Sequence, residues 1–580
     1  MKKSSTKRLL SYITVHNKLL IISLLTAIIN VFFTLLNPIL IGDAIDFIIG
    51  KDNVDFQGIL KIIGILILSI ILASLSQWIM TRCTNVITYK TVAALREDVF
   101  NKINKVPLKY IDSHSHGDIM SRIINDIDQI STGLLQGFSQ LFTGIITILG
   151  TLGIMIAINF KIALVVVLMT PLSILVGGFI AKSSKAMFTE QSKIRGEITG
   201  YTQEMIGNQK LVKAFSYENN SEEKFQEINS RLYTSGVKSQ FFSSLTNPCT
   251  RFVNGIVYAT VGIISAISAI NGNISIGKIS SFLNYANQYT KPFNEISSVI
   301  TELQSALASA ERVFEVLDEE DEPLDKENAI NLKECNGNIE IKNVSFSYNP
   351  EVKLIENFNL SVKKGEKIAI VGPTGCGKTT LINLLMRFYN INSGEIFISG
   401  YNINDITRKS SRAMFGMVLQ ETWLYSGTIK ENIAYGKPDA TDEEIIEAAK
   451  MAHAHEFITR LPNGYDTKIS GDGNNISQGQ KQLLCIARIM LTKPPMLILD
   501  EATSSIDTRT EIFIQNAFNK MMEGRTSFIV AHRLSTIKEA DLILVMNKGH
   551  IIEQGTHEEL IEKKGFYANL YNSQFSVPIS

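Results

Sequence analysis

Long apolar runs crowd the first half of the chain and constrain its fold more than any other feature. A helix needs about 20 apolar residues to cross the hydrocarbon core of a bilayer, and six stretches reach or nearly reach that length. They are Leu19–Ile41, Ile59–Met80, Gly137–Ile158, Ile162–Ile180, Phe252–Ile270 and Ile276–Ile300. The second half has no apolar run of this length and is predicted to be soluble. We therefore expect an all-α domain of six transmembrane helices, with the lipid bilayer as one partner, followed by a soluble domain.

Basic residues predict the orientation of these spans. Lys and Arg cluster before the first span, whereas the first outer loop is acidic. The basic residues are Lys2, Lys3, Lys7, Arg8 and Lys18, and the acidic ones are Asp43, Asp46, Asp52 and Asp55. By the positive-inside rule both termini are cytoplasmic. We expect a multi-pass protein, and we place it in the plasma membrane of a bacterium. The first span is too long for a signal peptide and lacks a small-residue cleavage site, so we expect it to be retained.

The connections between spans are strongly unequal. The outer turn at Asn159–Lys161 is tight, whereas the cytoplasmic connections near Thr81–Gln136 and Ala181–Arg251 are long and have helical periodicity. Helices that continue beyond the bilayer explain this, and they would give a motor levers on which to push. These connections include Tyr110–His116 and Gln209–Phe215, to which the family resemblance described below assigns the role of short coupling helices.

One face of the sixth span is polar. Asn284, Gln288, Lys291 and Glu295 recur at i, i+4, i+7 and i+11, the spacing of one helix face. These side chains either hydrogen-bond to neighbouring helices or line a water-filled pathway. No other Asp or Glu occurs within the six spans, so a proton- or sodium-driven carrier is disfavoured and the energy source is expected elsewhere.

Composition changes after the sixth span. The acidic run Asp318–Glu322 ends at Pro323 and predicts a solvated linker. We place a transmembrane domain at residues 1–310, a linker at 311–337 and a second domain at 338–576, which the motifs described next identify as nucleotide-binding. Lys+Arg and Asp+Glu both total 56, so no charge excess indicates a nucleic-acid partner. The five cysteines form no metal-ligand spacing and are expected to be free thiols.

The second half of the chain contains a glycine-rich motif between a predicted strand and a predicted helix. The apolar strand Lys367–Val371 runs into a GxxxxGK[ST] motif and then a helical pattern. The motif residues are Gly372, Pro373, Thr374, Gly375, Cys376, Gly377, Lys378, Thr379 and Thr380. Backbone N–H groups of such a loop wrap phosphates, and the helix N-terminus adds its positive dipole end. Lys378 would reach the β- and γ-phosphates of ATP, and Thr379 would hold Mg²⁺.

A second strand ends in two carboxylates. The apolar run Met496–Leu499 leads to Asp500 and Glu501, which predicts a buried parallel strand that delivers both at its C-terminal end, where ligands bind. Asp500 would order the Mg²⁺ shell, and Glu501 would act as general base on the attacking water. We therefore expect an α/β P-loop NTPase fold with ATP and Mg²⁺ as cofactors.

With these motifs in order, the chain resembles the ABC exporters, specifically half-transporters with the membrane domain first. The resemblance spans residues 10–575 and implies an ATP hydrolase. It assigns adenine stacking to Tyr348, a nucleotide- and Mg²⁺-sensing role to Gln420, and a γ-phosphate contact to His532. Ser477, Gly479 and Gln480 fall in the signature motif, and Asp507 falls in the D-loop. In the membrane half, Gly117–Arg122 and Asn125–Asp128 also match the exporter pattern.

The chain departs from the family at its signature motif. It has Gln478 where the family has its first glycine, and Gly471 and Asp472 where the upstream segment has Glu and Arg. These departures resemble one subunit of a heterodimeric multidrug exporter, in which one composite ATP site is degenerate. A homodimer that tolerates Gln478 is the alternative.

The resemblance implies ATP-driven export of a small amphipathic solute, such as a drug, lipid or peptide, by alternating access. An importer that uses the exporter fold, as in siderophore uptake, is one alternative. A nucleotide-gated channel or regulatory subunit is another, although intact Lys378, Asp500 and Glu501 disfavour it. The transported substrate is not specified by any of these residues.

Overall fold

The computed structural model describes residues 5–48, 54–419, 422–470, 475–500, 506–530 and 534–575. The chain divides into two compact units. The helical unit comprises Met1–Lys105 and Ser115–Glu319, and the sheet unit comprises Val106–His114 and Glu320–Ser580. The prediction of a helical membrane domain followed by an α/β domain is confirmed. The predicted domain boundary at residue 310 stays a prediction. The last helix of the helical unit continues beyond it, to Asp318.

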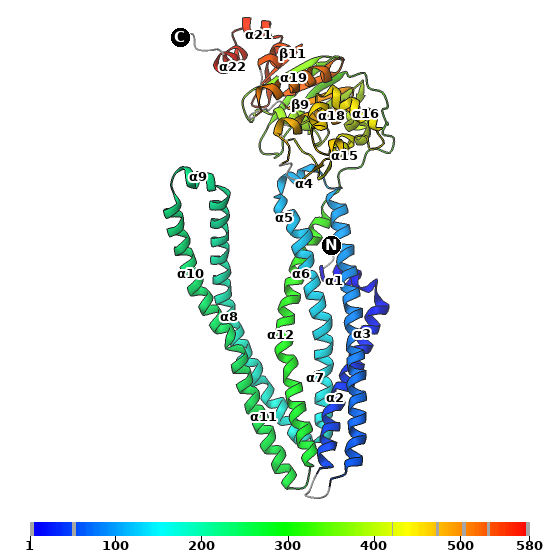
Figure 1. Cartoon of the computed structure of the whole chain (residues 1–580), viewed down its shortest axis with the longest axis vertical. Helices are drawn as coiled ribbons and strands as arrows, with labels where there is room; N and C mark the ends of the chain where they lie inside the picture. Colours follow the sequence, from blue (N-terminus) through cyan, green and yellow to red (C-terminus); the bar gives the residue numbers. More distant parts are fainter. Residues whose placement is uncertain are drawn as a thin grey trace. The chain divides into compact units, whose positions relative to one another are not determined.

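The helical unit consists of long helices joined by short turns (Figure 1). Its elements are α1 (Ser5–Thr14), α2 (Asn17–Asp46), α3 (Phe56–Ile103), α5 (His116–Ser121), η1 (Arg122–Asp126), α6 (Ile127–Gln136), η2 (Gly137–Leu141), α7 (Phe142–Ile158), α8 (Phe160–Gly207), α9 (Gln209–Ala214), α10 (Glu218–Ser244), α11 (Thr246–Ile270) and α12 (Ile276–Asp318). Helices cover all six predicted spans. By length and composition, four described helical stretches suffice to cross a membrane, namely Asn17–Asp46, Phe56–Ile103, His116–Ile158 and Glu218–Ile270. The other two predicted spans lie in α8 and α12.

The spans continue well beyond membrane thickness, as expected. Helices α3 and α8 each contain 48 residues, which corresponds to about 72 Å at 1.5 Å per residue against a hydrocarbon core of about 30 Å. Asn159 alone separates α7 from α8, and its side chain accepts hydrogen bonds from the N–H groups of Lys161 and Ile162. The short helix α9 joins α8 to α10 at the tip of this hairpin (Figure 1), where a coupling helix was predicted.

Helices α2 and α12 approach each other through glycine. A Cβ atom on Gly277 would lie 1.9 Å from the carbonyl oxygen of Gly42, so only glycine allows this separation of the two backbones. Hydrogen bonds also join the two helices at several positions along their length. The contacts run from Ser275 Oγ and the Gly277 N–H to the Asp46 carboxylate (2.5 and 2.7 Å), from Ser281 Oγ to the Pro38 carbonyl (2.7 Å), and from the Tyr285 hydroxyl to the Leu35 carbonyl. The paired segment of α2 and α12 is therefore held by hydrogen bonds to the Asp46 carboxylate and to two backbone carbonyls of α2.

The sheet unit contains three sheets. The largest has the order β12-β11-β3-β10-β9-β6 and is parallel except at β12. A four-stranded antiparallel sheet has the order β2-β1-β4-β5, and β7 pairs with β8. The strands are β1 (Ile339–Phe346), β2 (Ile355–Val362), β3 (Lys367–Val371), β4 (Ser393–Ile398), β5 (Tyr401–Asn402), β6 (Phe415–Val418), β7 (Gly427–Thr428), β8 (Lys468–Ile469), β9 (Met496–Asp500), β10 (Thr526–Val530), β11 (Leu542–Asn547) and β12 (His550–Gly555).

The helical elements of the unit are α4 (Leu108–Ser113), α13 (Lys378–Leu385), η3 (Ile403–Asp405), α14 (Arg408–Ala413), α15 (Ile429–Ala434), α16 (Asp442–Met451), α17 (His455–Thr459), η4 (Gly464–Asp466), α18 (Gln478–Thr492), α19 (Thr508–Met522), α20 (Leu534–Lys538), α21 (His557–Glu562) and α22 (Phe566–Phe575). Helices α18 and α19 cover one face of the largest sheet, and α13 together with the antiparallel sheet covers the other. Alternate residues of β9 enter opposite cores: Leu497 and Leu499 pack with α18 and α19, whereas Met496 and Ile498 pack with α13 and the antiparallel sheet. Burial on both faces explains why these strands read as continuous apolar runs.

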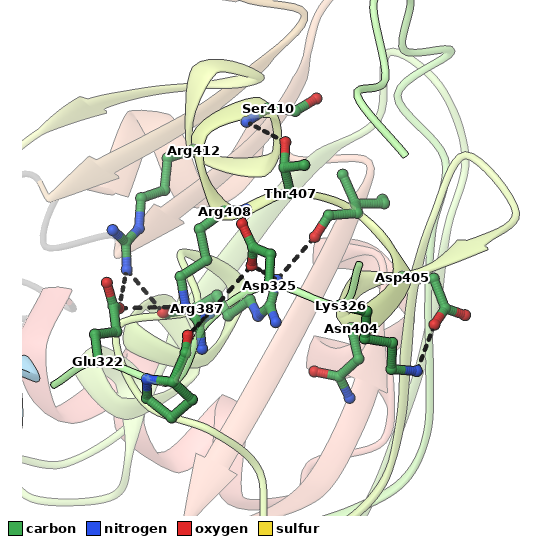
Figure 2. Close-up of polar contacts among 12 residues, drawn as sticks. Glu322, Asp325, Lys326, Arg387, Asn404, Asp405, Thr407, Arg408, Ser410 and Arg412 are labelled. Carbon is green, nitrogen blue, oxygen red and sulfur yellow. Dashed lines mark hydrogen bonds and ion pairs between the residues drawn. The ribbon is translucent and has the colours of Figure 1, made fainter. Parts of the chain in front are cut away.

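The linker is exposed over Asp318–Asp321, as expected, but its following residues dock onto the sheet unit. Figure 2 shows Glu322 and Asp325 against three arginines of the sheet unit. Asp325 contacts Arg387 at 3.2 Å and Arg408 at 3.1 Å, and Glu322 contacts Arg412 at 2.6 Å. The prediction of a solvated connector is therefore wrong for Glu322, the last acidic residue of the run.

Because two of these arginines are buried, their positive charges require the linker carboxylates as partners. The side chains of Arg387 and Arg408 are only 7% and 9% exposed. Burial, together with the nearby Arg408 charge, lowers the pKa of Arg387. Without the two carboxylates, several like charges would be buried together, which is costly.

The glycine contact between α2 and α12 gives a test of the helical unit. Replacing Gly277 with alanine forces the backbones apart, because the new Cβ would lie 1.9 Å from the Gly42 carbonyl oxygen. Overpacking of this kind costs about 1–3 kcal/mol, so we expect Gly277→Ala to lower the thermal midpoint in detergent. Gly153→Ala is the matched control, since a Cβ there meets no atom within 4 Å. Equal midpoints for the two variants would contradict the contact.

Candidate nucleotide-binding site

Parallel pairing brings three chain segments to one edge of the large sheet. Strand β10 lies between β3 and β9, and Val530 pairs with Ile370 on one side and Asp500 on the other. The carboxyl ends of the three strands therefore lie at the same level. Ligands bind at this edge of open parallel sheets. The loop that follows β3 and the carboxylate that ends β9 are two strands apart.

The loop after β3 has a backbone that only glycine can supply. Gly372 has φ of +156°, and a Cβ there would lie 2.2 Å from the carbonyl oxygen of Met546. Gly377 has φ of +105° and immediately precedes the first residue of α13, Lys378. Two glycines thus let the chain turn back tightly onto a helix N-terminus, the geometry that cradles phosphate.

Lys378 lies across this loop. Its Nζ donates to the carbonyl oxygens of Gly372 (2.9 Å) and Pro373 (3.1 Å). Both acceptors belong to the loop itself. The ammonium group is therefore held beside the loop, within reach of the phosphate oxygens of a nucleotide bound there. A cation over a glycine-lined cradle fits a polyphosphate.

The side chains of the loop divide by burial. Pro373, Thr374, Gly375 and Thr379 are exposed, whereas Thr380 and Cys376 are buried. The Cys376 thiol packs in the core between the sheets, so this residue can reach a phosphate only through its backbone. The exposed Thr379 hydroxyl is the one suited to hold Mg²⁺, together with the Asp500 carboxylate.

Three predicted site residues, Gln420, Glu501 and His532, lie outside the described residues. The chain positions beside them are described. Strand β6 ends at Val418, β9 ends at Asp500 and β10 ends at Val530. Their assignments stay predictions.

Tyr348 belongs to an aromatic cluster beside the loop. Its ring makes edge-on contacts with Phe346 and Tyr389, with centroids 4.9 Å apart in both cases. Its hydroxyl accepts a hydrogen bond from Asn383 of α13 at 3.1 Å. The ring stays 40% exposed, which leaves surface on which an adenine could stack.

Sequence reasoning missed Tyr389. Its hydroxyl donates to the Asp112 carboxylate of α4 at 2.5 Å, and burial followed by this bond raises the pKa of Tyr389. The hydroxyl therefore remains a donor. Helix α4 was predicted as a coupling helix, so Tyr389 joins it directly to the ring proposed for adenine. Only the position of Tyr389 after α13 was visible in the sequence, and nothing there pointed to Asp112.

The signature segment forms the start of α18. Ser477 and Gln480 cap this helix reciprocally: the Ser477 hydroxyl accepts from the Gln480 N–H, and the Gln480 side chain accepts from the Ser477 N–H (3.3 and 2.9 Å). Gly479 packs against α19, where a Cβ would lie 2.4 Å from Thr510. Gln478 donates from Nε2 to the Thr422 hydroxyl at 3.0 Å.

Asp507, the predicted D-loop residue, caps α19. Its carboxylate accepts from the Thr510 N–H at 2.9 Å, and that bond lowers the pKa of Asp507. The side chains of Ser477, Gln480 and Asp507 are thus engaged in helix caps, and their nucleotide contacts stay predictions.

Comparison with known proteins agrees with this geometry. Residues 20–293 match the family model described as ABC transporter transmembrane region, and residues 355–504 match the one described as ABC transporter. The fatty acid ABC transporter ATP-binding/permease protein of Mycobacterium tuberculosis is 43% identical, over 90% of this chain and 82% of its own length. A putative multidrug export ATP-binding/permease protein of Bacillus subtilis is 35% identical, over 98% and 99%. The solved structure of a bacterial Atm1-family ABC exporter with ATP bound aligns with a TM-score of 0.78 at 27% identity, covering 98% of this chain and 100% of that one.

The bond between Tyr389 and Asp112 predicts a measurable link from the aromatic cluster to α4. Tyr389→Phe keeps the ring and removes the donor, a loss of about 0.5–1.5 kcal/mol for a hydrogen bond of this kind. We expect amide hydrogen exchange in α4 to become roughly 2–10-fold faster, with ATP affinity unchanged. Tyr401→Phe, at an exposed ring of β5, is the control. Unchanged exchange in α4 of the Tyr389 variant would rule out the link.

Proposed function

Because the chain belongs to the ABC transporter family, with the transmembrane region ahead of the ATP-binding domain, we propose that it exports a small amphipathic solute as one half of a two-subunit transporter. One observation carries the proposal. The glycine cradle after β3 and the Asp500 carboxylate of β9 lie at the same sheet edge, on a chain whose other unit consists of membrane-length helices.

The proposed chemistry is hydrolysis of ATP. Lys378 and the loop N–H groups bind the phosphates, and Thr379 and Asp500 hold Mg²⁺, which neutralises phosphate charge when bound. Glu501 accepts a proton from the attacking water, whose oxygen bonds to the γ-phosphorus as the bond to the β–γ bridging oxygen breaks. His532 contacts the γ-phosphate. The role of Glu501 follows from its place directly after Asp500.

Transmission to the membrane is assigned to α4 and α9. Helix α4 belongs to the sheet unit although its neighbours in sequence belong to the helical unit, so movement of the sheet unit pulls directly on the ends of α3 and α5. Helix α9 closes the hairpin of α8 and α10 in the helical unit (Figure 1). Both helices sit at the ends of rigid levers, which is what alternating access requires.

We assign the second subunit to a different chain. Gln478 replaces the first glycine of the signature, and its amide is committed to Thr422 within the same subunit. A bulky side chain at this point obstructs the approach of backbone amides to the ATP held by the partner. The composite site completed by this signature is then the weakly hydrolysing one, whereas this chain supplies Lys378 and Glu501 to the active one.

We infer the direction of transport and the class of substrate from the similar proteins. Proteins named for multidrug export and a structure titled as an exporter match nearly the whole chain, and a relative of 43% identity is named for fatty acids. Export of amphipathic solutes from a bacterial plasma membrane, with both chain termini cytoplasmic, accounts for all three. Uptake on the same fold is the competing direction.

Vesicle transport tests the proposal. In inverted vesicles, we expect this chain co-expressed with its partner to accumulate a fluorescent amphiphile when ATP is added, and the chain alone to accumulate little. Glu501→Gln in the pair should reduce accumulation by about 100-fold or more while ATP binding persists, because a general base contributes roughly 10²–10⁴. The matched control is Glu539→Gln at an exposed site. Full activity of the chain alone would contradict the heterodimer, and ATP-driven efflux from inverted vesicles would contradict export.

A further inference from the structure

Packing fixes the rotation of α12 within the helical unit. Phe282, Tyr285 and Tyr289 are at most 6% exposed and belong to one apolar cluster with residues of α2, α7, α8 and α11. The Tyr285 hydroxyl also donates to the Leu35 carbonyl of α2. One face of α12 is therefore committed to the interior of its own subunit, and the opposite face points out of it.

The outward face of α12 is polar. Asn284, Asn287 and Lys291 are exposed, at the i, i+3 and i+7 positions of one helix face. Gln288 lies beside them, and its Oε1 is buried without a hydrogen-bond partner among the described residues. Pro292 follows, and because proline has no N–H the carbonyl of Gln288 lacks its usual i+4 donor. This face thus combines a cation, side-chain amides and freed acceptors.

Lys291 lies at membrane depth. It is 16 positions beyond the Ser275 cap of α12, about 24 Å along the helix axis in a hydrocarbon core of about 30 Å. The other charged residues of the six predicted spans are Lys61 and Lys278, each the third residue of its span, and Glu295. Glu295 lies about 30 Å along, at the boundary of the core, and its side chain is outside the described residues. Lys291 is therefore the one deep cation, and no ion pair is recorded for it among the described residues.

A lipid-facing role does not fit this surface. Unsatisfied acceptors and an ammonium group are costly against hydrocarbon, and ionisable residues at this depth mark substrate pathways. Snorkelling of Lys291 to lipid headgroups would leave the exposed amides of Asn284 and Asn287, deeper in the membrane, without water. Among the described residues, Asn284 would then keep only the bond that its Nδ2 donates to the Ser280 carbonyl. The face is accordingly turned to an aqueous pathway, and among its described side chains the strong charge that it presents there is positive.

We propose that Lys291 binds the carboxylate of a fatty acid within the transport pathway, with the amides of Asn284, Asn287 and Gln288 as flanking hydrogen-bond partners. This inference rests on the proposed function and specifies its substrate class. A single cation in an otherwise nearly uncharged set of spans complements an amphiphile with one anionic group and an apolar remainder. Its depth, on the side predicted to be cytoplasmic, suits a head group that enters from the inner leaflet. A relative that is 43% identical is named as a fatty acid ABC transporter protein, which is consistent with this substrate class.

Transport by the reconstituted two-subunit transporter tests the inference with three probes: palmitate, the neutral hexadecanol and the anionic lysophosphatidate. We expect Lys291→Gln to raise the half-saturating palmitate concentration by roughly tenfold, the typical effect of losing a charge-assisted bond, and to leave hexadecanol transport unchanged. Lys291→Arg should retain most palmitate transport. Lys278→Gln, an exposed lysine near the start of α12, is the matched control and should behave as wild type.

The other outcomes each overturn the inference in a distinguishable way. Equal palmitate transport by Lys291→Gln and wild type removes Lys291 from the site. Equal loss of palmitate and hexadecanol transport in an assembled Lys291→Gln transporter makes the residue structural. Lys291-dependent transport of lysophosphatidate, but not palmitate, assigns a phosphate head group instead. Failure of the wild-type transporter to move any amphiphile with ATP contradicts the proposed function itself.

Discussion

The parallel pairing of β3, β10 and β9 is the constraint on which the rest of the sheet unit depends. Val530 sits between Ile370 and Asp500 in register, so the phosphate loop and the acidic strand end meet at one edge even though some 130 residues separate them. Leu497 and Ile498 are fully buried on opposite faces. A one-residue slip would therefore exchange the two cores and move the carboxylate away from Lys378.

The helical unit uses a different kind of constraint. Long uninterrupted helices carry displacement over distances that loops could not, and the close α2–α12 contact at Gly42 and Gly277 makes that pair move as one body. Helix α4 belongs to the sheet unit, although the segments before and after it in the sequence belong to the helical unit. Tyr389 bonds to Asp112 there and contacts the Tyr348 ring edge-on, so one side chain links helix α4 to the ring that is proposed to stack on adenine.

Features encoded by adjacent residues could be predicted from the sequence, and those that depend on distant partners could not. The phosphate loop from Gly372 to Thr380 and the apolar spans are local patterns, and both predictions agree with the structure. Docking of the C-terminal part of the linker was not predicted, because Asp325 contacts Arg387 and Arg408, which lie 62 and 83 residues away. The bond of Tyr389 to Asp112 joins residues 277 positions apart, and no periodicity records such a pairing.

ATP turnover by the purified two-subunit transporter with Lys378→Ala in this chain tests the central claim most directly. If the loop after β3 holds the triphosphate that Asp500 and Glu501 help to cleave, turnover falls by at least about 100-fold, and ATP affinity at this site falls with it. Lys364→Ala, at an exposed lysine just before β3, should leave both unchanged. Wild-type turnover in the Lys378 variant would contradict the account.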